Sequence, residues 1–464
     1  MDTAAQTFAA FSSSLHLERV PREVTEAAKL HLLDTLGCGL AAHALDVAPA
    51  AREALTETGV AGPATAVGVR GGLPSADAAL INGVTCHALD YDDTHTGAIA
   101  HVSVAVAPAA LAAGQAAGAQ GADVLAAVIG ANEIVTRLGL AVGSAFHARG
   151  FHPTSICGVF GATAAAAAVW GLDRSATVNA LGIAGSMASG LLEYLADGSS
   201  TKRLHPGWAA HAGIIASRLA AHGATGPASV IEGRFGLYSA FVQREETDIA
   251  SQAADLGERW ETPRIAFKPY PACHYVHASL DALAQLIAEH PLQIDDIEEI
   301  VALSTEAGVS LVLEPLADKY RPRSEYEAKF SLPYSLASLL IRGTVDVSTF
   351  TDEAIQDEEV LRLAGKVRYE VREYPTFPQA LPGGVRVRTR DGQTFEAELD
   401  HQRGGPENPM TDAQVRDKFR ANAILALGDE DVDALEACVM TLEQQDRLDG
   451  LEILSHAAPH FQLI

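Results

Sequence analysis

The sequence has few cysteines and no recognisable secretory start. Its five cysteines, Cys38, Cys86, Cys157, Cys273 and Cys438, are odd in number, far apart and never in a Cys-x-x-Cys pair. This usage argues against a disulfide framework and indicates a reducing compartment. The first twenty residues lack a basic segment followed by a long apolar core, so we expect no secretory signal.

Cations and long apolar runs are also scarce. The sequence holds 33 Lys and Arg against 59 Asp and Glu, a formal net charge of −26. This balance argues against a nucleic-acid partner, and an anionic substrate would need the few cations gathered locally. The most apolar stretch, residues 102–117, is Ala- and Gly-rich and interrupted by Pro108, so we expect no membrane span. These features predict a soluble, cytoplasmic protein.

In the first half of the sequence, apolar residues recur with the period of an α-helix. At 464 residues the chain is long enough for two or three domains. Apolar residues recur at spacings of three and four, which predicts helices over residues 21–45, 75–89, 102–117, 123–140, 153–170 and 174–187. Few runs alternate with period two, so residues 1–265 are expected to form a mostly helical domain.

After about residue 263 the pattern is mixed. We expect helices over residues 277–290 and 325–341, strands over 297–304 and 367–372, and a hairpin of 385–390 with 393–399 around a type I′ turn at Asp391-Gly392. The helical period returns over residues 411–427 and 430–442. The expected fold class is mostly α with an inserted α+β domain. The helical domain would comprise residues 1–265 and 404–464, and the α+β domain residues 266–403.

The most unusual stretch, residues 86–108, crowds ionisable side chains between Ala- and Val-rich segments. Burying carboxylates without partners costs several kcal/mol each, so these groups face a cleft or bind something. The side chains that could hold Zn, Mn or Fe are His87, Asp90, Asp92, Asp93, His95 and His101. Their spacing fits no established metal signature, and a turn with helix-capping aspartates is the plainer alternative. We expect no metal.

Four further polar segments interrupt the apolar pattern. His152 precedes a helix start that carries two hydroxyl residues, an arrangement that favours anions. Residues 197–207 contain Lys202 and enter another helix without the spacing of a phosphate-binding loop. Lys268 precedes a proline-stiffened turn, and residues 319–323 form a basic spot. We expect His87, His205, His274 and His277 to be structural, and Cys157 and Cys273 to be small core residues.

Together these segments resemble the MmgE/PrpD family along essentially the whole chain. The matching stretches stand in the family's order: HALDYDDTH, HPTSICGVFGA, DGSSTKRLHPGWAAHAG, EGRFGLY, FKPYPACHYVH and RGGPENPMT. Members include 2-methylcitrate dehydratases, cis-aconitate decarboxylases and an iminodisuccinate epimerase. The resemblance implies an all-helical domain, a smaller α+β lid domain, a homodimer, and a site between the domains that needs neither metal nor organic cofactor.

The resemblance also implies roles for single residues. Those expected to be catalytic are His101, His152, Asp90 and Tyr320, with Tyr334 as the other candidate for the lid tyrosine, and those expected to bind substrate are Thr94, Lys202 and Lys268. Two departures from the family's pattern leave the identity of the substrate undetermined. His95 stands where some members carry an aromatic residue, and the loop before His101 is one residue longer than in decarboxylase-like members.

The chemistry that these residue types allow is common to three reactions. Dehydration of a hydroxy acid, decarboxylation of an unsaturated acid and epimerisation beside a carboxylate all place negative charge on carbon. A well-placed cation stabilises such charge by about 3–4 kcal/mol, and a histidine with a pKa of about 6.5 can move the proton. We expect a hydro-lyase that dehydrates a 2-methylcitrate-like acid, because that label is commonest in the family. The alternatives are a cis-aconitate-type decarboxylase, an iminodisuccinate-type epimerase and a noncatalytic carboxylate-binding protein.

Overall fold

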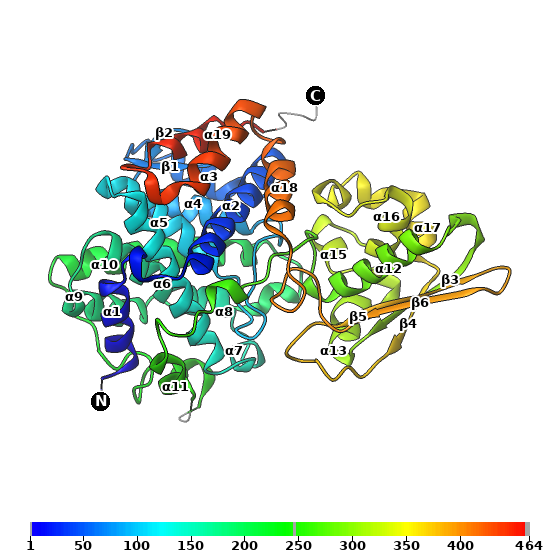
Figure 1. The fold of residues 1–464 in the computed structure, drawn as a ribbon, viewed down its shortest axis with the longest axis horizontal. Coiled ribbons are helices and arrows are strands. Elements are labelled where there is room, and N and C mark those ends of the chain that lie inside the picture. Colours follow the sequence, from blue (N-terminus) through cyan, green and yellow to red (C-terminus); the bar gives the residue numbers. More distant parts are fainter. Residues whose placement is uncertain (1, 245–246, 460–464) are drawn as a thin grey trace. The chain divides into compact units, whose positions relative to one another are not determined.

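The computed structural model describes residues 2–244 and 247–459, and the chain divides into two compact units. The first unit consists of Met1–Ala88, Asp92–Ala266 and Thr411–Ile464, and the second of Leu89–Tyr91 and Phe267–Met410. Figure 1 shows the helices and strands of both units. The short segment Leu89–Tyr91 therefore interrupts the first unit and belongs to the second.

The first unit is built on long helices. Its interior holds α2 (Arg22–Ala44), α4 (Ser75–His87), α5 (Ser103–Ala117), α6 (Gly121–Leu140), α8 (Pro153–Val169) and α10 (Thr201–Ala221). Around them lie α1 (Ala4–Ser14), α3 (Ala50–Thr56), α7 (Ala145–Ala148), α9 (Arg174–Ala184), α11 (Ile249–Ala254), α18 (Asp412–Ala423) and α19 (Asp429–Met440). Small residues let the interior helices approach closely: a Cβ on Gly83 of α4 would lie 2.6 Å from the Cα of Gly207 in α10.

Most of the predicted helices of this unit are confirmed within a few residues. The unit also contains a short antiparallel hairpin that the sequence analysis missed, formed by β1 (Ala64–Ala66) and β2 (Val69–Leu73). The expectation of an all-helical first domain was wrong at this point. Strands of three and five residues, the second with Gly71 and Gly72 inside it, are too short to show a period of two.

The second unit is an α+β structure. Its sheet has the order β4-β3-β5-β6. Strand β3 (Ile297–Ser304) pairs parallel with β4 (Val367–Val371) and antiparallel with β5 (Gly383–Thr389), which pairs antiparallel with β6 (Thr394–Leu399). The helices are α12 (His277–Glu289), α13 (Glu306–Gly308), α14 (Leu316–Tyr320), α15 (Glu325–Lys329), α16 (Leu332–Arg342) and α17 (Glu358–Ala364), and α12 packs against β5 and β6 (Figure 1). Both strands of the predicted hairpin are confirmed.

Two local predictions in this unit were wrong. The helix expected over residues 325–341 is two helices, because the Ser331 hydroxyl caps a new start by accepting from the Tyr334 N–H. The turn at residues 391–392 is not type I′, which needs positive φ at both residues. Only Gly392 has positive φ, at 85°, and its N–H donates to the Thr389 carbonyl at 3.0 Å. The hairpin therefore closes through a three-residue loop.

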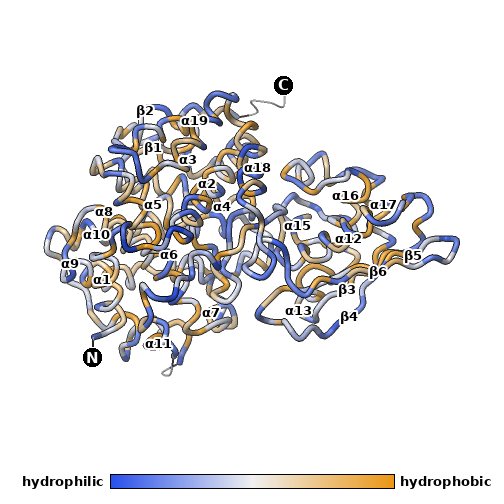
Figure 2. Tube along the Cα trace, viewed as in Figure 1, coloured by the Kyte–Doolittle hydropathy of each residue, from blue (hydrophilic) through white to orange (hydrophobic). Residues whose placement is uncertain are grey.

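The two units have separate hydrophobic cores. The core of the second unit lies between its sheet and its helices and includes Leu280, Ile300 and Leu336. In the first unit, Figure 2 shows hydrophobic residues along the interior helix α5 and hydrophilic ones along α18. Among the described residues, no helix has the length and apolar content needed to cross a membrane. The mostly helical fold class with a smaller α+β part is confirmed.

Candidate active site

The ionisable stretch lies in the loop that joins α4 to α5. Asp92 and Asp93 are fully buried there, and Asp90 is 5% exposed. The backbone of Asp90 has φ 53° and that of Ile99 has φ 51°, a region that non-glycine residues rarely occupy. Strained positions persist only where surrounding contacts hold them. The loop is therefore a constrained structure and not a solvated turn.

Within the first unit, Asp92 accepts hydrogen bonds from two histidines. The Asp92 Oδ2 atom lies 2.9 Å from Nδ1 of His87 and 2.8 Å from Nδ1 of His101, and the Thr94 hydroxyl lies 3.3 Å from the same atom of His101. Burial would raise the pKa of Asp92, but His101 and His87 together hold it well below its usual range. Asp92 is thus an anionic acceptor that fixes the ring orientation of both histidines.

The same three residues could hold a cation. One ligand atom from each of His87, Asp92 and His101 lies within 4.8 Å of the others. Two imidazoles and a carboxylate suit Zn²⁺ chemically. However, an ion would have to replace both histidine hydrogen bonds to Asp92, which already account for the positions of these groups. We therefore treat the group as an acid–base cluster.

A second pair of histidines lies next to this cluster. His152, just before α8, is 3% exposed, and its Nδ1 is 3.0 Å from Nδ1 of His205 in α10. The ring centroid of His152 is 5.9 Å from that of His87 and 6.3 Å from that of His101. These distances place the four imidazoles in one cluster in the first unit.

The charge of Lys202 acts on these histidines. Burial and then His87 and Lys202 hold the pKa of His152 well below its usual range, and the same causes lower the pKa of His205 to about 4. Lys202 itself is buried, at 7% exposure, in the first turn of α10. At neutral pH His152 and His205 are thus neutral imidazoles beside the buried side chain of Lys202. Such a site accepts an anionic ligand and can move a proton.

Hydrogen bonds tie the loop between α4 and α5 to the rest of the first unit. The His101 N–H donates to the Thr154 hydroxyl at 3.0 Å, and the Thr94 N–H donates to the Ala266 carbonyl at 2.9 Å. Asp93 accepts from the N–H of Ser103 at 3.1 Å and lies 2.8 Å from Nδ1 of His31. Asp93 is therefore a structural carboxylate of this loop.

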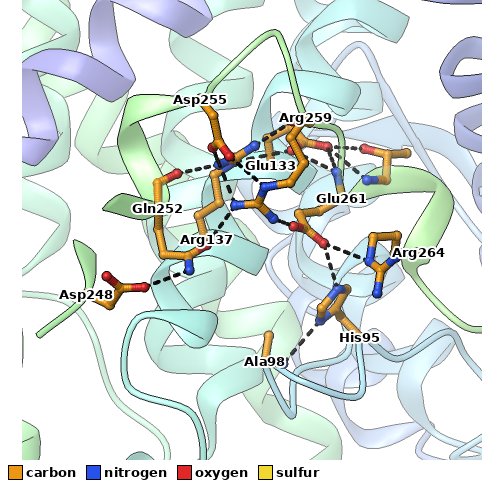
Figure 3. Close-up of polar contacts among 11 residues, drawn as sticks. His95, Ala98, Glu133, Arg137, Asp248, Gln252, Asp255, Arg259, Glu261 and Arg264 are labelled. Atoms are coloured by element: carbon orange, nitrogen blue, oxygen red, sulfur yellow. Dashed lines mark hydrogen bonds and ion pairs between the residues drawn. The ribbon is translucent and has the colours of Figure 1, made fainter. Parts of the chain in front are cut away.

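His95 of the same loop is turned into a partly buried ionic network (Figure 3). Its Nε2 lies 3.2 Å from the carboxylate of Glu261, and its Nδ1 accepts from the Ala98 N–H at 3.1 Å. Burial, followed by the charge of Arg264, lowers the pKa of His95 to about 4. Because both ring nitrogens are occupied by protein groups, the structure places His95 as an anchor of the loop.

The network is centred on Arg137 of α6, which is fully buried. Figure 3 shows its guanidinium directed at Glu133, Asp255 and the backbone of Gln252. Glu133 accepts in turn from the N–H groups of Glu261 at 2.9 Å and of Thr262 at 2.8 Å. These bonds hold the segment that carries Glu261 against α6. The network thus fixes the acceptor to which His95 is anchored.

The second unit holds the other predicted site residues. Lys268, 2% exposed, donates to the carbonyls of Asp90 at 2.7 Å and Ala272 at 3.0 Å and lies 3.3 Å from the Asp90 carboxylate. Lys329, 1% exposed, donates to the neighbouring Leu89 carbonyl at 2.8 Å. Two buried lysines thus hold successive carbonyls of Leu89–Tyr91. Lys268 supports the left-handed conformation of Asp90 directly.

The two candidate tyrosines differ in exposure. Tyr334 is fully buried in the second core, and its hydroxyl donates to the Thr349 carbonyl at 2.7 Å. Tyr320 is half-buried at the end of α14, and its hydroxyl donates to the Val367 carbonyl at 2.7 Å and accepts from Arg368 at 2.8 Å. Of the two, Tyr320 is nearer the protein surface.

The structure thus sorts the predicted residues into two groups. His101, His152, Thr94 and Lys202 lie in the first unit, and Asp90, Lys268 and Tyr320 in the second.

Sequence reasoning treated His87 and His205 as structural and did not single out Lys329. The sequence around Lys329 gave no clear signal, because Glu325 and Glu327 stand close before it, as beside many surface lysines. Burial raises the pKa of the Cys157 thiol above its usual range, which disfavours a nucleophilic role.

Comparison with known proteins gives matches over most of the chain. The MmgE/PrpD N-terminal domain matches residues 6–250, and the MmgE/PrpD C-terminal domain matches residues 270–444. The human protein "Cis-aconitate decarboxylase" is 31% identical over 472 residues, covering 98% of this chain and 95% of the relative. "Cis-aconitate decarboxylase" of Aspergillus terreus is 28% identical over 484 residues, with 98% and 94% covered. "Cis-aconitate decarboxylase-like protein oryM" of Aspergillus oryzae is 26% identical over 446 residues, with 91% of each chain covered. The chain therefore belongs to the MmgE/PrpD family.

Proposed function

We propose that this protein is a lyase that decarboxylates an unsaturated tricarboxylate of the cis-aconitate type. The observation that carries the proposal is its similarity, along nearly the whole length of both chains, to proteins named cis-aconitate decarboxylase. The comparisons favour this alternative over the dehydration of a 2-methylcitrate-like acid that the sequence analysis ranked first. The buried His/Asp/Lys cluster of the first unit supports it chemically.

The reaction needs a cation and a proton donor. When one carboxylate leaves as CO₂, the electron pair of the broken C–C bond moves into the carbon skeleton, and one carbon takes up a proton. Lys202 would hold a remaining carboxylate and stabilise the developing negative charge, a contribution of about 3–4 kcal/mol for a well-placed donor. His101 or His152 would supply the proton, and Thr94 would hydrogen-bond substrate. Asp92 would keep His101 oriented.

The predicted residues of the second unit take supporting roles in this proposal. Lys268 and Asp90 act as a pair, since Lys268 bonds to both the carbonyl and the carboxylate of Asp90. Tyr320 remains the predicted proton-donating tyrosine. We also propose that residues 266–403 act as a lid domain, that the protein is a cytoplasmic homodimer, and that the reaction needs no metal or organic cofactor. These statements, like the role of Tyr320, remain predictions.

The test is a substrate panel followed by NMR. The protein is incubated separately with cis-aconitate, 2-methylcitrate and iminodisuccinate, and products are identified from their carbon and proton signals. We expect turnover of cis-aconitate with release of CO₂. Turnover of 2-methylcitrate or iminodisuccinate alone would replace the proposal by the dehydratase or the epimerase. Saturable binding of all three without turnover would indicate a carboxylate-binding protein.

A further inference from the structure

Decarboxylation on the proposed function consumes a proton in every turnover, because a C–C bond is replaced by a C–H bond. The proton donor must therefore be reloaded from solvent. His152 is only 3% exposed, so water reaches it poorly. Among the described residues, the ring of His205 is a hydrogen-bonded neighbour through which a proton could arrive, with 3.0 Å between the two Nδ1 atoms.

His205 lies in the wall of a pocket of 350 Å³ in the first unit. The pocket is lined by residues of the segment 189–208, among them two acids, Glu193 and Asp197, and the exposed side chains of Leu191 and Trp208. A volume of this size holds several water molecules, each taking about 30 Å³. Carboxylates beside such water favour the local presence of protons. The pocket thus gives His205, the hydrogen-bonded neighbour of His152, access to water beside two carboxylates.

We propose that His205 is a proton-relay residue that reloads His152 from this pocket. In the resting state His205 carries its proton on Nδ1 and donates it to the bare Nδ1 of His152, which carries its own proton on Nε2. His152 gives the Nε2 proton to the substrate carbon and takes the Nδ1 proton of His205. His205 then takes a proton from pocket water on Nε2. One proton leaves solvent and one C–H bond forms, so the turnover leaves each ring with its proton on the other nitrogen. When the product leaves, each ring gives that proton to water and takes one on its original nitrogen, which restores the resting state with no net change in protons.

The local structure holds the two rings in register. The Ser155 hydroxyl of α8 donates to the His205 carbonyl at 3.1 Å, and the His152 N–H donates to the Gly190 carbonyl at 3.0 Å. Gly190 has φ 128°, and a Cβ there would lie 2.9 Å from that of Ser155, so only glycine fits. Tyr194, 6.3 Å from His152 and 5.9 Å from His205 between ring centroids, packs beside both.

The charged groups around His205 also suit a proton relay. The charged and titratable groups that act on His205 are His152, His87 and Lys202, with Glu193 and Asp197 in the pocket. Burial, followed by the neighbouring His87 and Lys202, lowers the pKa of His205 to about 4, so the ring is neutral at pH 7. A neutral imidazole can accept a proton on one nitrogen while it releases one from the other. A permanently charged ring could not.

The proposal is tested with His205→Ala, His205→Asn and His211→Ala, using whichever substrate the protein turns over. His211 is the matched control, because it lies on the same helix and bonds to the Ala76 carbonyl. We expect His205→Ala to lower kcat roughly tenfold or more with little change in KM, and added imidazole to restore kcat saturably. His205→Asn, which can bond to His152 but cannot relay, should stay impaired. Full activity of His205→Asn, or a loss in His205→Ala that imidazole does not restore, would overturn the relay.

A second measurement needs no turnover and so separates this inference from the proposed function. In protein labelled with ¹⁵N-histidine, we expect a protonated Nδ1 on His205 and an unprotonated Nδ1 on His152. The opposite tautomers would overturn the proposed direction of transfer. If no tricarboxylate is decarboxylated but these tautomers are found, the proposed function fails and the relay geometry stands. Melting temperatures of all variants, compared with that of the unsubstituted protein, check that each is folded.

Discussion

The ammonium group of Lys268 lies 3.3 Å from the carboxylate of Asp90 and donates to the carbonyl oxygen of the same residue at 2.7 Å. A single buried lysine thus neutralises the side chain of Asp90 and fixes its backbone at φ 53°. Removing one partner of a buried ion pair typically costs about 3–5 kcal/mol, because the other charge stays buried. We therefore expect Lys268 to matter for folding as well as for substrate.

The first prediction is that Lys268→Ala lowers stability and weakens binding and turnover together, and that its stability effect is not additive with that of Asp90→Asn. Asn tolerates the left-handed backbone and removes the charge that Lys268 balances. Denaturant unfolding and steady-state kinetics on both single variants and the double variant measure this coupling. Lys366→Met, which removes another lysine-to-carbonyl bond of the second unit, should lower stability without the kinetic loss. Additive effects of the two substitutions would show that the pair is not coupled.

The second prediction concerns the proton donors. His101→Gln and His152→Gln should each lower kcat by roughly 100-fold or more if that histidine transfers the proton, with a smaller change in KM. Lys202→Ala should instead change both constants, because the carboxylate is held in the ground state and in the transition state. Near-normal turnover in both histidine variants would remove them as acid–base residues and favour Asp90, Tyr320 or water.

The third prediction concerns metal removal. Because hydrogen bonds to Asp92 already satisfy Nδ1 of His87 and of His101, activity should survive EDTA and exhaustive dialysis. Elemental analysis of the dialysed protein, together with its turnover, measures this. Activity that is lost on dialysis and returns with one particular divalent ion would make the three residues ligands.

The fourth prediction is a loss of stability in mild acid. Burial lowers the pKa of four histidines to about 4: His87, His95, His147 and His205. In the unfolded chain their pKa returns to about 6.5, so the unfolded state binds more protons between pH 6.5 and pH 4. Stability should therefore fall as the pH drops through this window.

Two buried carboxyls oppose this trend. Burial raises the pKa of Asp34 to about 6 despite its ion pair with Lys418, and burial also raises the pKa of Glu133, so at these sites the folded state binds more protons as the pH falls. Four histidines outweigh two carboxyls, and the net change should be destabilising. Melting temperatures at constant ionic strength from pH 7.5 to pH 4.5 check the sign. A flat or rising profile would mean that these histidines take up protons in the folded state.

The fifth prediction is a homodimer. Leu195 and Phe235 of the first unit are large apolar side chains with 52% and 86% of their surface exposed. Apolar surface of this kind often marks an interface. Light scattering should give a mass near twice 48.6 kDa. A monomer at micromolar concentration would contradict the prediction.

Regular elements were the part of the fold that the sequence predicted best. Helices such as α2 and α6 have apolar residues at helical spacing for about six turns, and strand β3 has the predicted bounds, Ile297–Ser304. The break between α15 and α16 was missed because the apolar period continues through it. A single cap at Ser331 outweighs that period. Short elements were missed for a related reason, since the three residues of β1 carry no periodicity.

The candidate site was predicted as a set of segments but not as a set of contacts. The matching motifs gave His101, His152, Lys202 and Lys268. They could not show that Asp92 bonds to both His87 and His101, because Asp90, Asp92 and Asp93 stand in the same short run. His205 bonds to His152, 53 positions away in the sequence, and Lys329 bonds to Leu89, 240 positions away. Such pairings exist only once the tertiary fold is formed.

Because Leu89–Tyr91 belongs to the second unit, that unit combines parts of the chain that are synthesised at different times. Asp90 leaves the ribosome 178 residues before Lys268, and Leu89 leaves it 240 residues before Lys329. The second unit is therefore incomplete during most of synthesis, and its first part must wait unpaired while the chain grows. A genetic fragment of residues 267–410 alone would lack the tripeptide, leaving Lys268 without Asp90 and Lys329 without the Leu89 carbonyl. The second unit is thus compact in space but cannot be excised as one continuous piece of sequence.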